Sequence, residues 1–499
     1  MNWDALLPLL IVLSSLIVGI VIFFLPEERA LIRITLNLAA AVFKLLLVGI
    51  ISWGMFFHGQ HYEFRMLLLP GLDLVLRADA LSILFVTLST ILWLVTTVYA
   101  IGYLEGSPHR SRFFGFFSLC VTATVGVALA GNLITFLLFY ELLTLTTYPL
   151  IVHRGTEEAR RAGRSYLIYT MSGGVLILAG TVWLYAIAGT LEFSYGGFVS
   201  DLVNDHHRAL IAIFVLLIAG LGVKAALVPF HGWLPQAMIA PAPVSALLHA
   251  VAVVKAGAFG IVRVVDDVYG VETAADLGVT GPLAVLAGVT IIYGSLRALF
   301  QDDLKRRLAF STVSQVSYII LGIAIAGPVA TMGGLVHLVH QGVMKITLFF
   351  CAGNLAETLG IHKVSEMNGV GRRMPWTMAA FTIGALGMIG LPPLAGFISK
   401  WYLGLGALET GQHWVIYILA GSSLLNAAYF LPILYTAWFK LPPDSWSAER
   451  SFGHAETAWT LLLPPVITAF LTLAVGVLAS APFSPLHWAR FITTLEYLP

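Results

Sequence analysis

Residues 222–262, GVKAALVPFHGWLPQAMIAPAPVSALLHAVAVVKAGAFGIV, decide the fold of this chain. The stretch is apolar enough to lie in a membrane, yet it carries Lys224, Lys255 and four prolines. A lysine at bilayer depth costs about 2.5–3.5 kcal/mol. Proline breaks at that depth are tolerated where the freed backbone groups face protein or a wet cavity. Charges beside broken helices therefore indicate movement of ions through a membrane.

The whole chain has the composition of an integral membrane protein. Its 499 residues are 59% hydrophobic and 11% charged, with a mean hydropathy of +0.90, whereas a soluble domain is about 25% charged. The two cysteines lie in separate apolar runs without a CxxC, so no iron–sulfur site is expected. The first apolar run lacks a basic leader and a cleavage site, which favours a retained helix. No nucleotide-binding or hydrolytic motif is present.

Hydrophobic runs predict an all-α protein with about fourteen transmembrane helices. Runs of about 20 apolar residues, enough to cross a bilayer, recur along nearly the whole sequence. The seventh and twelfth runs are too long and too interrupted to be simple helices, and their breaks are predicted at Pro229 and Pro393. The longer connections, 57–78 and 189–208, are predicted to form hairpins outside the membrane. The predicted spans are 5–25, 31–56, 79–102, 113–130, 132–152, 165–188, 209–240, 242–264, 280–300, 307–326, 329–355, 375–408, 413–439 and 457–481.

An internal repeat relates the two broken spans. Residues 227–234 (LVPFHGWL) and 391–398 (LPPLAGFI) share the pattern Leu-x-Pro-x-x-Gly-aromatic-aliphatic. An odd number of predicted spans separates the copies, so they run in opposite directions across the membrane, as inverted repeats of transporters do. The predicted units are an N-terminal three-helix segment (1–112), a first repeat (113–264, helices four to eight), a second, inverted repeat (280–440, helices nine to thirteen) and a C-terminal helix with a short tail (457–499).

The distribution of lysine and arginine predicts the orientation. Sixteen of these residues lie at or beside loops that follow odd-numbered spans, whereas the loops after even-numbered spans hold Arg65, Arg77, Arg208 and Arg263. By the positive-inside rule, the odd loops lie in the cytoplasm and both termini lie outside. We therefore expect a multi-pass protein of the cell membrane.

Glu141 and Lys224 are the first candidates for a transport path. Glu141 lies mid-span in FLLFYELLTLTTYPL, without a basic residue within ten positions, so it needs a partner or a proton. Lys224 is the expected partner. The two form either a structural ion pair or a pair that opens and closes as a proton passes, and the cost of charges in a membrane favours the second. Lys44, nearer a helix end, is expected to snorkel and is left out of the path.

The remaining candidates are lysines and histidines inside predicted spans. Burial lets a lysine lose and regain a proton. His249, six residues before Lys255, either joins the path through water or a third group, or is a core histidine. His337 and His340 share a helical face without carboxylate or cysteine neighbours, which favours a relay over a metal site. A stripe of hydroxyl side chains in the predicted tenth span either hydrates the path or forms hydrogen bonds with its own helix. The stripe consists of Ser311, Thr312, Ser314 and Ser317. The predicted proton path is Glu141, Lys224, His249, Lys255, His337, His340, Lys345 and Lys400, with no metal and no cofactor.

Several stretches resemble the antiporter-like membrane subunits of respiratory complex I and of multisubunit, Mrp-type cation/proton antiporters. The resemblance covers nearly the whole chain and implies fourteen helices in two inverted five-helix repeats. It implies that Glu141 and Lys224 are the coupling pair, Lys255 the central site and Lys400 the terminal site, with the histidines as the relay. The stretches are KAALVPFHGWLPQAMIAPAPVSALLHAVAVVKAG, LRADALSILF, NLITFLLFYELLTLTTYPLI, DDLKRRLAFSTVSQVSYIILG, HLVHQGVMKITLFFCAGN and GLPPLAGFISKW.

Length and the lysine set are most similar to the D-type Mrp subunit, which implies a proton-translocating subunit of a cation (Na⁺)/H⁺ antiporter. The alternative is a proton-pumping subunit of a complex I or membrane-hydrogenase type redox complex, without redox centres of its own. A non-transporting scaffold would have no use for the buried lysines. Other membrane subunits, protons, Na⁺ and the lipid bilayer are the expected partners, and nucleic acid is not. Alone, the chain is expected to be a transporter rather than an enzyme, or, in the alternative, a non-redox subunit of an oxidoreductase.

Overall fold

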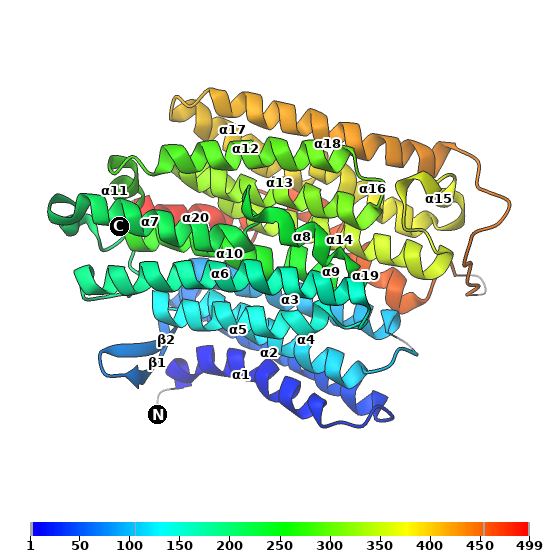
Figure 1. Ribbon diagram of the computed structural model, residues 1–499, viewed down its shortest axis with the longest axis horizontal. Helices are drawn as coiled ribbons and strands as arrows, with labels where there is room; N and C mark the ends of the chain where they lie inside the picture. The colour runs from blue at the N-terminus through cyan, green and yellow to red at the C-terminus, as the bar shows by residue number, and fades with distance from the viewer. Residues whose placement is uncertain (1–2, 105, 453–454, 498–499) are drawn as a thin grey trace.

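Helices that run along the long axis of the molecule make up most of the fold (Figure 1). The computed structural model describes residues 3–104, 106–452 and 455–497. Within them, 13 helices are long and apolar enough to cross a membrane. The interrupted pair α16 (Pro375–Ile389) and α17 (Ala395–Glu409) supplies a fourteenth span. The predicted all-α architecture with about fourteen spans is therefore confirmed.

The N-terminal part contains three long helices and the first predicted hairpin. Its strands pair antiparallel, with Arg65 opposite Val75. Asp79 follows the second strand and begins the next helix, because its carboxylate accepts a hydrogen bond from the Ser82 N–H at 2.7 Å. The elements are α1 (Trp3–Phe23), α2 (Ala30–His58), β1 (Tyr62–Leu69), β2 (Leu72–Ala78) and α3 (Ala80–Tyr103).

The prediction of a second hairpin in residues 189–208 was wrong. Apart from short turns, such as the 3.0 Å bond from the Gly197 N–H to the Ser194 carbonyl, backbone N–H groups of this segment bond to distant parts of the chain rather than across a pair of strands. Ser194 donates to the Asp267 carbonyl at 3.2 Å and Phe198 to the Val268 carbonyl at 3.0 Å. The segment is therefore a strap laid against the end of the eighth span.

The middle of the chain holds the helices of the first predicted repeat. Side-chain oxygens of Asn132 and Thr156 begin two of them by accepting hydrogen bonds from the Thr135 and Ala159 N–H groups. The elements are α4 (Arg110–Leu129), α5 (Leu133–Ile151), α6 (Glu157–Ala188), η1 (Ser200–Leu202), α7 (Val203–Lys224), η2 (Phe230–Gly232), α8 (Trp233–Gln236), η3 (Ala237–Ile239), α9 (Ala242–Ala250), α10 (Val253–Arg263), the π-helix η4 (Val264–Tyr269) and α11 (Val271–Asp276).

The last part of the chain holds the second predicted repeat and two further helices. The predicted short tail after residue 481 instead forms a 13-residue helix, Pro485–Tyr497, that packs against α3 and α14. The elements are α12 (Thr280–Leu299), α13 (Leu304–Ala324), α14 (Pro328–Leu359), η5 (Val364–Glu366), α15 (Val370–Arg373), α16, α17, α18 (Trp414–Phe439), α19 (Trp459–Val477) and α20 (Pro485–Tyr497).

Both predicted helix breaks are present. α7 ends at Lys224, and short turns follow through Pro229, which has no N–H to continue a helix. α16 ends at Ile389, directly before Gly390, whose φ of 95° favours glycine, and α17 begins beyond Pro393. The Val228–Pro229 and Pro392–Pro393 peptide bonds are cis.

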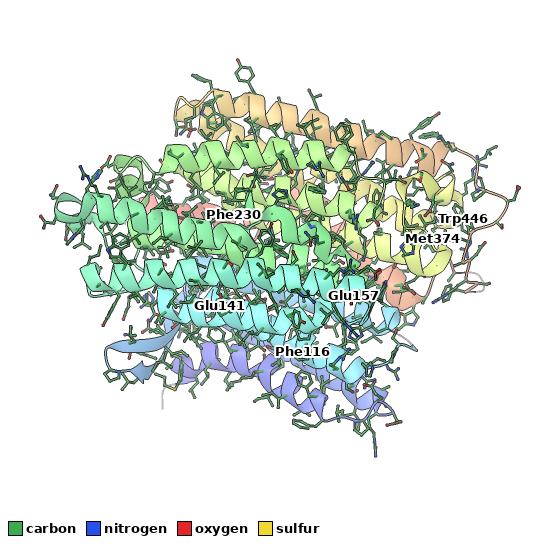
Figure 2. The ribbon with its side chains drawn as sticks, viewed as in Figure 1. Phe116, Glu141, Glu157, Phe230, Met374 and Trp446 are labelled. Carbon is green, nitrogen blue, oxygen red and sulfur yellow. The ribbon has the colours of Figure 1, made fainter. Side chains whose placement is uncertain are left out.

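The two broken helices run in opposite directions. Glu157, at the start of α6, and Met374, directly before α16, lie toward the same end of the bundle (Figure 2). Because α7 returns after α6, it begins at the other end. α7 and α16 are therefore antiparallel, as the inverted repeat predicts.

The eighth predicted span is also interrupted, which the sequence pattern did not predict. α9 ends at Ala250 and α10 begins at Val253, so the break falls between His249 and Lys255. The His249 carbonyl, near the break, accepts a hydrogen bond from the Gln341 side chain of α14 at 3.4 Å. A contact between distant helices thus accompanies the interruption, where the local sequence has neither proline nor glycine.

Three spans form the buried centre of the bundle. The most apolar windows of the α9–α10 span, α13 and α14 are completely buried, whereas those of α1, α6 and α18 are about one-third buried. The outer helices expose apolar side chains such as Leu46, Val175 and Tyr417, as lipid-facing helices do. Most of the predicted path residues lie on or beside the three central spans.

Candidate functional site

Lys224 and Glu141 lie close together without forming a direct ion pair. Lys224 is fully buried at the last position of α7, and its ammonium donates to the Tyr140 carbonyl oxygen of α5. The same ammonium lies 3.4 Å from the centre of the Tyr140 ring. Both Glu141 oxygens are buried without a hydrogen-bond partner among the described residues, and the carboxylate packs over Gly174 of α6. Figure 2 shows Glu141 away from both ends of the helices.

α10 approaches the end of α7 closely, next to Lys255. A side chain at Gly257 would collide with the backbone of Lys224 and Ala225. Glycine at this position therefore lets the start of α10 touch the residue that carries the first buried ammonium. Lys224 and Lys255 thus lie on neighbouring elements whose contact is direct.

Lys255 joins the first half of the chain to α14. It is fully buried, and its ammonium donates to the Leu338 carbonyl at 2.7 Å. Leu338 lies between His337 and His340 on the same helix. The lysine therefore contacts the backbone of the segment that carries both histidines.

His337 connects α14 to the helix that carries Lys400. Its Nδ1 forms a hydrogen bond of 2.8 Å with the Ser399 hydroxyl of α17, directly before Lys400. Its ring packs against Tyr318, and the Lys400 ammonium lies 5.4 Å from the centre of the same tyrosine ring. His337 and Lys400 therefore share two neighbours.

Lys400 uses the carbonyl groups that the second helix break exposes. Its half-buried side chain donates to the Ile389 carbonyl at 2.8 Å, to the Met388 carbonyl at 3.2 Å and to the Ser423 hydroxyl of α18 at 2.8 Å. The last carbonyls of a helix have no partner within it. Met388 is the position that corresponds to Lys224 in the repeat, so Lys400 contacts the backbone of the second break at the position equivalent to Lys224.

Lys345 contacts the predicted polar stripe of α13. Its ammonium donates to the Ser311 hydroxyl at 2.7 Å and to the Leu308 carbonyl at 3.2 Å. Ser311 also accepts from Tyr429 at 2.8 Å. Thr312 and Ser317 instead donate to carbonyls of their own helix. Thr312 and Ser317 therefore follow the second predicted alternative, whereas Ser311 contacts a lysine of the predicted path.

His249 and His340 are fully buried, and none of their ring nitrogens has a hydrogen-bond partner in the described part of the chain. The His249 ring stacks on Phe349 at 4.6 Å. A buried polar nitrogen without a partner is costly, so such a group is either hydrated or in use. No group of three or more His, Cys, Asp or Glu side chains in the described residues is arranged to hold a metal ion.

Lys44 does not snorkel, contrary to the prediction. It is fully buried, donates to the Ser15 hydroxyl at 2.6 Å and lies 4.8 Å from the centre of the Trp93 ring. Neighbouring helices α1 and α3 cover the side of α2 that carries it, which the position of Lys44 within α2 could not reveal.

Charged residues at the end of the eighth span were also missed. Arg263, assigned to a loop by its sequence position, is buried and pairs with Asp79 and Asp267. Asp266 is buried beside them. Two adjacent aspartates at the end of an apolar run were a signal, but they are equally compatible with an exposed loop.

The chain matches family models and proteins over most of its length. Residues 130–426 match the family described as NADH:quinone oxidoreductase/Mrp antiporter, TM, and residues 71–114 match NADH-ubiquinone oxidoreductase (complex I), chain 5 N-terminus. The chain is 35% identical over 490 residues to NADH-quinone oxidoreductase subunit N of Desulforudis audaxviator (strain MP104C), covering 95% of this chain and 96% of that protein.

Two further similarities extend over nearly the same length. The chain is 29% identical over 486 residues to the D-type subunit of the Na(+)/H(+) antiporter of Bacillus subtilis (strain 168), covering 96% of this chain and 94% of that protein. A chain in the structure of the Mrp complex from Dietzia sp. DQ12-45-1b superposes with a TM-score of 0.85 at 22% identity, covering 99% of this chain and 98% of that one. That superposition shows a shared fold.

Proposed function

Because the chain belongs to the NADH:quinone oxidoreductase/Mrp antiporter transmembrane family, we propose that it is a proton-translocating membrane subunit of a multisubunit Mrp-type cation (Na⁺)/H⁺ antiporter. Residues 113–264 and 280–440 act as its two inverted repeats. Protons move along a buried path, which we call the axis. It consists of Glu141, Lys224, His249, Lys255, His337, His340, Lys345 and Lys400. The contact of Lys255 with the α14 backbone between the two histidines carries this proposal.

The axis lysines have neutral partners, which suits proton transfer. Carbonyl and hydroxyl oxygens accept from Lys224, Lys255, Lys345 and Lys400. These partners orient an amine in either protonation state, whereas a bound carboxylate would fix the charged state. A proton on one lysine then repels a proton on the next, so arrival at one end favours release at the other.

A redox complex is the second candidate, and the identity values favour it. The chain is 35% identical to the quinone oxidoreductase relative and 29% identical to the antiporter relative. In this role the chain would pump protons without redox centres of its own, while other chains carry electrons.

Purification of the native complex separates the two candidates. For the antiporter, mass spectrometry should identify further antiporter subunits, and proton movement in proteoliposomes should require Na⁺ or another monovalent cation. Quinone- or hydrogenase-type subunits, together with proton movement that follows electron transfer and ignores Na⁺, would replace the antiporter assignment by the redox one.

The proposed orientation in the cell membrane predicts a labelling pattern. Basic residues concentrate on one side of the predicted topology, which supports an orientation with that side in the cytoplasm and both termini outside. A membrane-impermeant maleimide added to intact cells should label Asp205→Cys and leave Glu158→Cys unlabelled. The native Cys120 and Cys351 are fully buried and give a low background. The reverse pattern, with label at Glu158→Cys alone, would invert the orientation.

A further inference from the structure

A second buried charge cluster lies where the eighth span ends. The Arg263 guanidinium is 2.7 Å from Asp79 and 3.0 Å from Asp267, and all three side chains are largely buried. Arg263 also donates to the Ser82 hydroxyl at 2.9 Å. Two carboxylates and a hydroxyl thus accept from the terminal nitrogens of the guanidinium, while its Nε has no partner in the described residues. They hold the end of α10 against the start of α3.

Two further carboxyl groups lie beside this ion pair network without a cation of their own. Asp266 is fully buried, and neither of its oxygens has a hydrogen-bond partner in residues 3–104, 106–452 and 455–497. Glu496 is 6% exposed, and one of its oxygens accepts from the Gly196 N–H at 3.4 Å while the other has no partner in the same residues. An unpaired carboxylate is very costly away from water, so such a group takes up a proton.

The fold brings these two carboxyl groups to the same place through the strap: Glu496 accepts from Gly196, and Ser194 donates to the carbonyl of Asp267, the chain neighbour of Asp266. Asp266 lies on the π-helix η4, and Glu496 lies at the end of α20. The Trp488 indole donates to the Ala80 carbonyl at 2.9 Å, and the Tyr497 hydroxyl forms a hydrogen bond of 2.7 Å with Thr331 of α14. α20 is thereby fixed at both ends, and Glu496 has a defined position.

A cavity links the cluster to the surface. Its volume is about 570 Å³, and Asp79, Asp267 and Tyr195 line it together with residues of the β1–β2 hairpin, among them Glu63 and Arg77. Water that fills the cavity reaches Asp267, the chain neighbour of Asp266. The cluster therefore lies between the protein interior and an aqueous space.

The cluster also continues the span that carries Lys255. Asp266 lies about 16 Å further along that span, at about 1.5 Å per residue. Tyr497, the neighbour of Glu496, contacts Thr331 on the helix that carries His337 and His340. The two helices that carry Lys255 and the histidines of the axis, α10 and α14, thus both extend to the neighbourhood of the carboxyl pair.

We propose that Asp266 and Glu496 share a proton and pass it between the axis and the cavity at the hairpin end of the molecule. This inference rests on the proposed function. A proton that reaches the pair converts a carboxylate to a carboxylic acid, and its loss to cavity water restores the carboxylate. Each carboxylate repels the other, so the pair holds one proton more readily than none.

Charged and titratable groups on every neighbouring element bear on this pair. Asp267 and Arg263 act on the pair from the span of Asp266, Tyr195 from the strap and Tyr497 from α20. Asp79, at the start of α3, acts through its ion pair with Arg263. Burial, with the nearby Asp267 and Asp266 carboxyls, raises the pKa of Glu496 well above the usual value of a glutamate. At neutral pH a proton is therefore available on this pair.

Isosteric replacement in the native complex tests the proposal. Asp266→Asn and Glu496→Gln should each lower the initial rate of proton transport in proteoliposomes by more than about tenfold, the effect of about 1.4 kcal/mol on a barrier. The thermal midpoint of the complex should not fall, because each amide keeps the shape of the carboxyl group and adds no buried charge. Asp266→Glu should keep a substantial part of the rate. The infrared band of a protonated carboxyl group should weaken in both isosteric variants.

One control variant and three contrary outcomes make the proposal falsifiable. The exposed Asp276 lies at the same end of the molecule, and Asp276→Asn should transport normally. Wild-type rates for Asp266→Asn and Glu496→Gln, in an assay where Lys255→Ala is inactive, would overturn the inference and leave the proposed function standing. Equal losses in Asp266→Asn and Asp266→Glu, with a lower thermal midpoint, would assign Asp266 a structural role and also overturn it. Normal transport by Lys255→Ala would instead overturn the proposed function, and the inference with it.

Discussion

Replacement of Glu141 by alanine is expected to abolish coupled proton transport while the chain still assembles with its partners. The Glu141 carboxylate lies near Lys224, whose ammonium is bound to the Tyr140 carbonyl. A negative charge on Glu141 favours a proton on Lys224, and loss of that charge favours its release. Without Glu141, the protonation of the first lysine of the axis no longer responds to a change of charge at position 141.

Assembly should survive because the Glu141 side chain is half-buried and makes no hydrogen bond within the described residues. Glu141→Asp keeps the charge and should retain part of the activity. The exposed Glu158 offers a control, and Glu158→Ala should transport at the wild-type rate. The coupling role of Glu141 would be refuted by full transport in vesicles that contain Glu141→Ala.

Lys255→Ala is expected to lower proton transport by more than about tenfold, a barrier change of about 1.4 kcal/mol or more. Lys255 contacts the α14 backbone directly, so its removal separates the Lys224 side of the axis from the histidines. The variant should remain folded, because a lysine at this depth costs about 2.5–3.5 kcal/mol and an alanine avoids that cost. Unchanged amounts of assembled complex in the membrane would check this expectation.

The helices and the two proline breaks could be predicted because their signals are local. A run of about 20 apolar residues indicates a span wherever it occurs. Pro229 and Pro393 each interrupt such a run, and the matched pattern around them indicated opposite directions. The structure confirms both breaks and the antiparallel course of α7 and α16.

The third interruption could not be predicted, because a distant contact accompanies it. Val251 and Ala252 lie in an apolar run without proline or glycine, and the nearby His249 carbonyl is bound by Gln341 of α14. The burial of Lys44 could not be predicted for the same reason. Its burial depends on which helices cover α2, and its own sequence position gave the opposite expectation.

The candidate path residues could be selected from the sequence, whereas their connections could not. Charged residues are rare inside apolar runs, so the sequence alone indicates which of them are candidates. This criterion selected Glu141, Lys224, Lys255 and Lys400. The acceptor of each ammonium depends on tertiary packing, as the Leu338 carbonyl shows. Asp266 and Glu496 lie 230 residues apart in sequence, and Glu496 lies beside the strap that covers the end of the eighth span because α20 folds back against α3 and α14.

The initial rate of proton transport by the native complex, with wild-type chain or Lys255→Ala, tests the central claim that protons follow the buried axis. Lys440→Ala, which removes an exposed lysine at the end of α18, is the matched control. A path through Lys255 predicts less than about one-tenth of the wild-type rate for Lys255→Ala and the wild-type rate for Lys440→Ala, at equal amounts of assembled complex. Wild-type transport by the Lys255→Ala complex would contradict the axis.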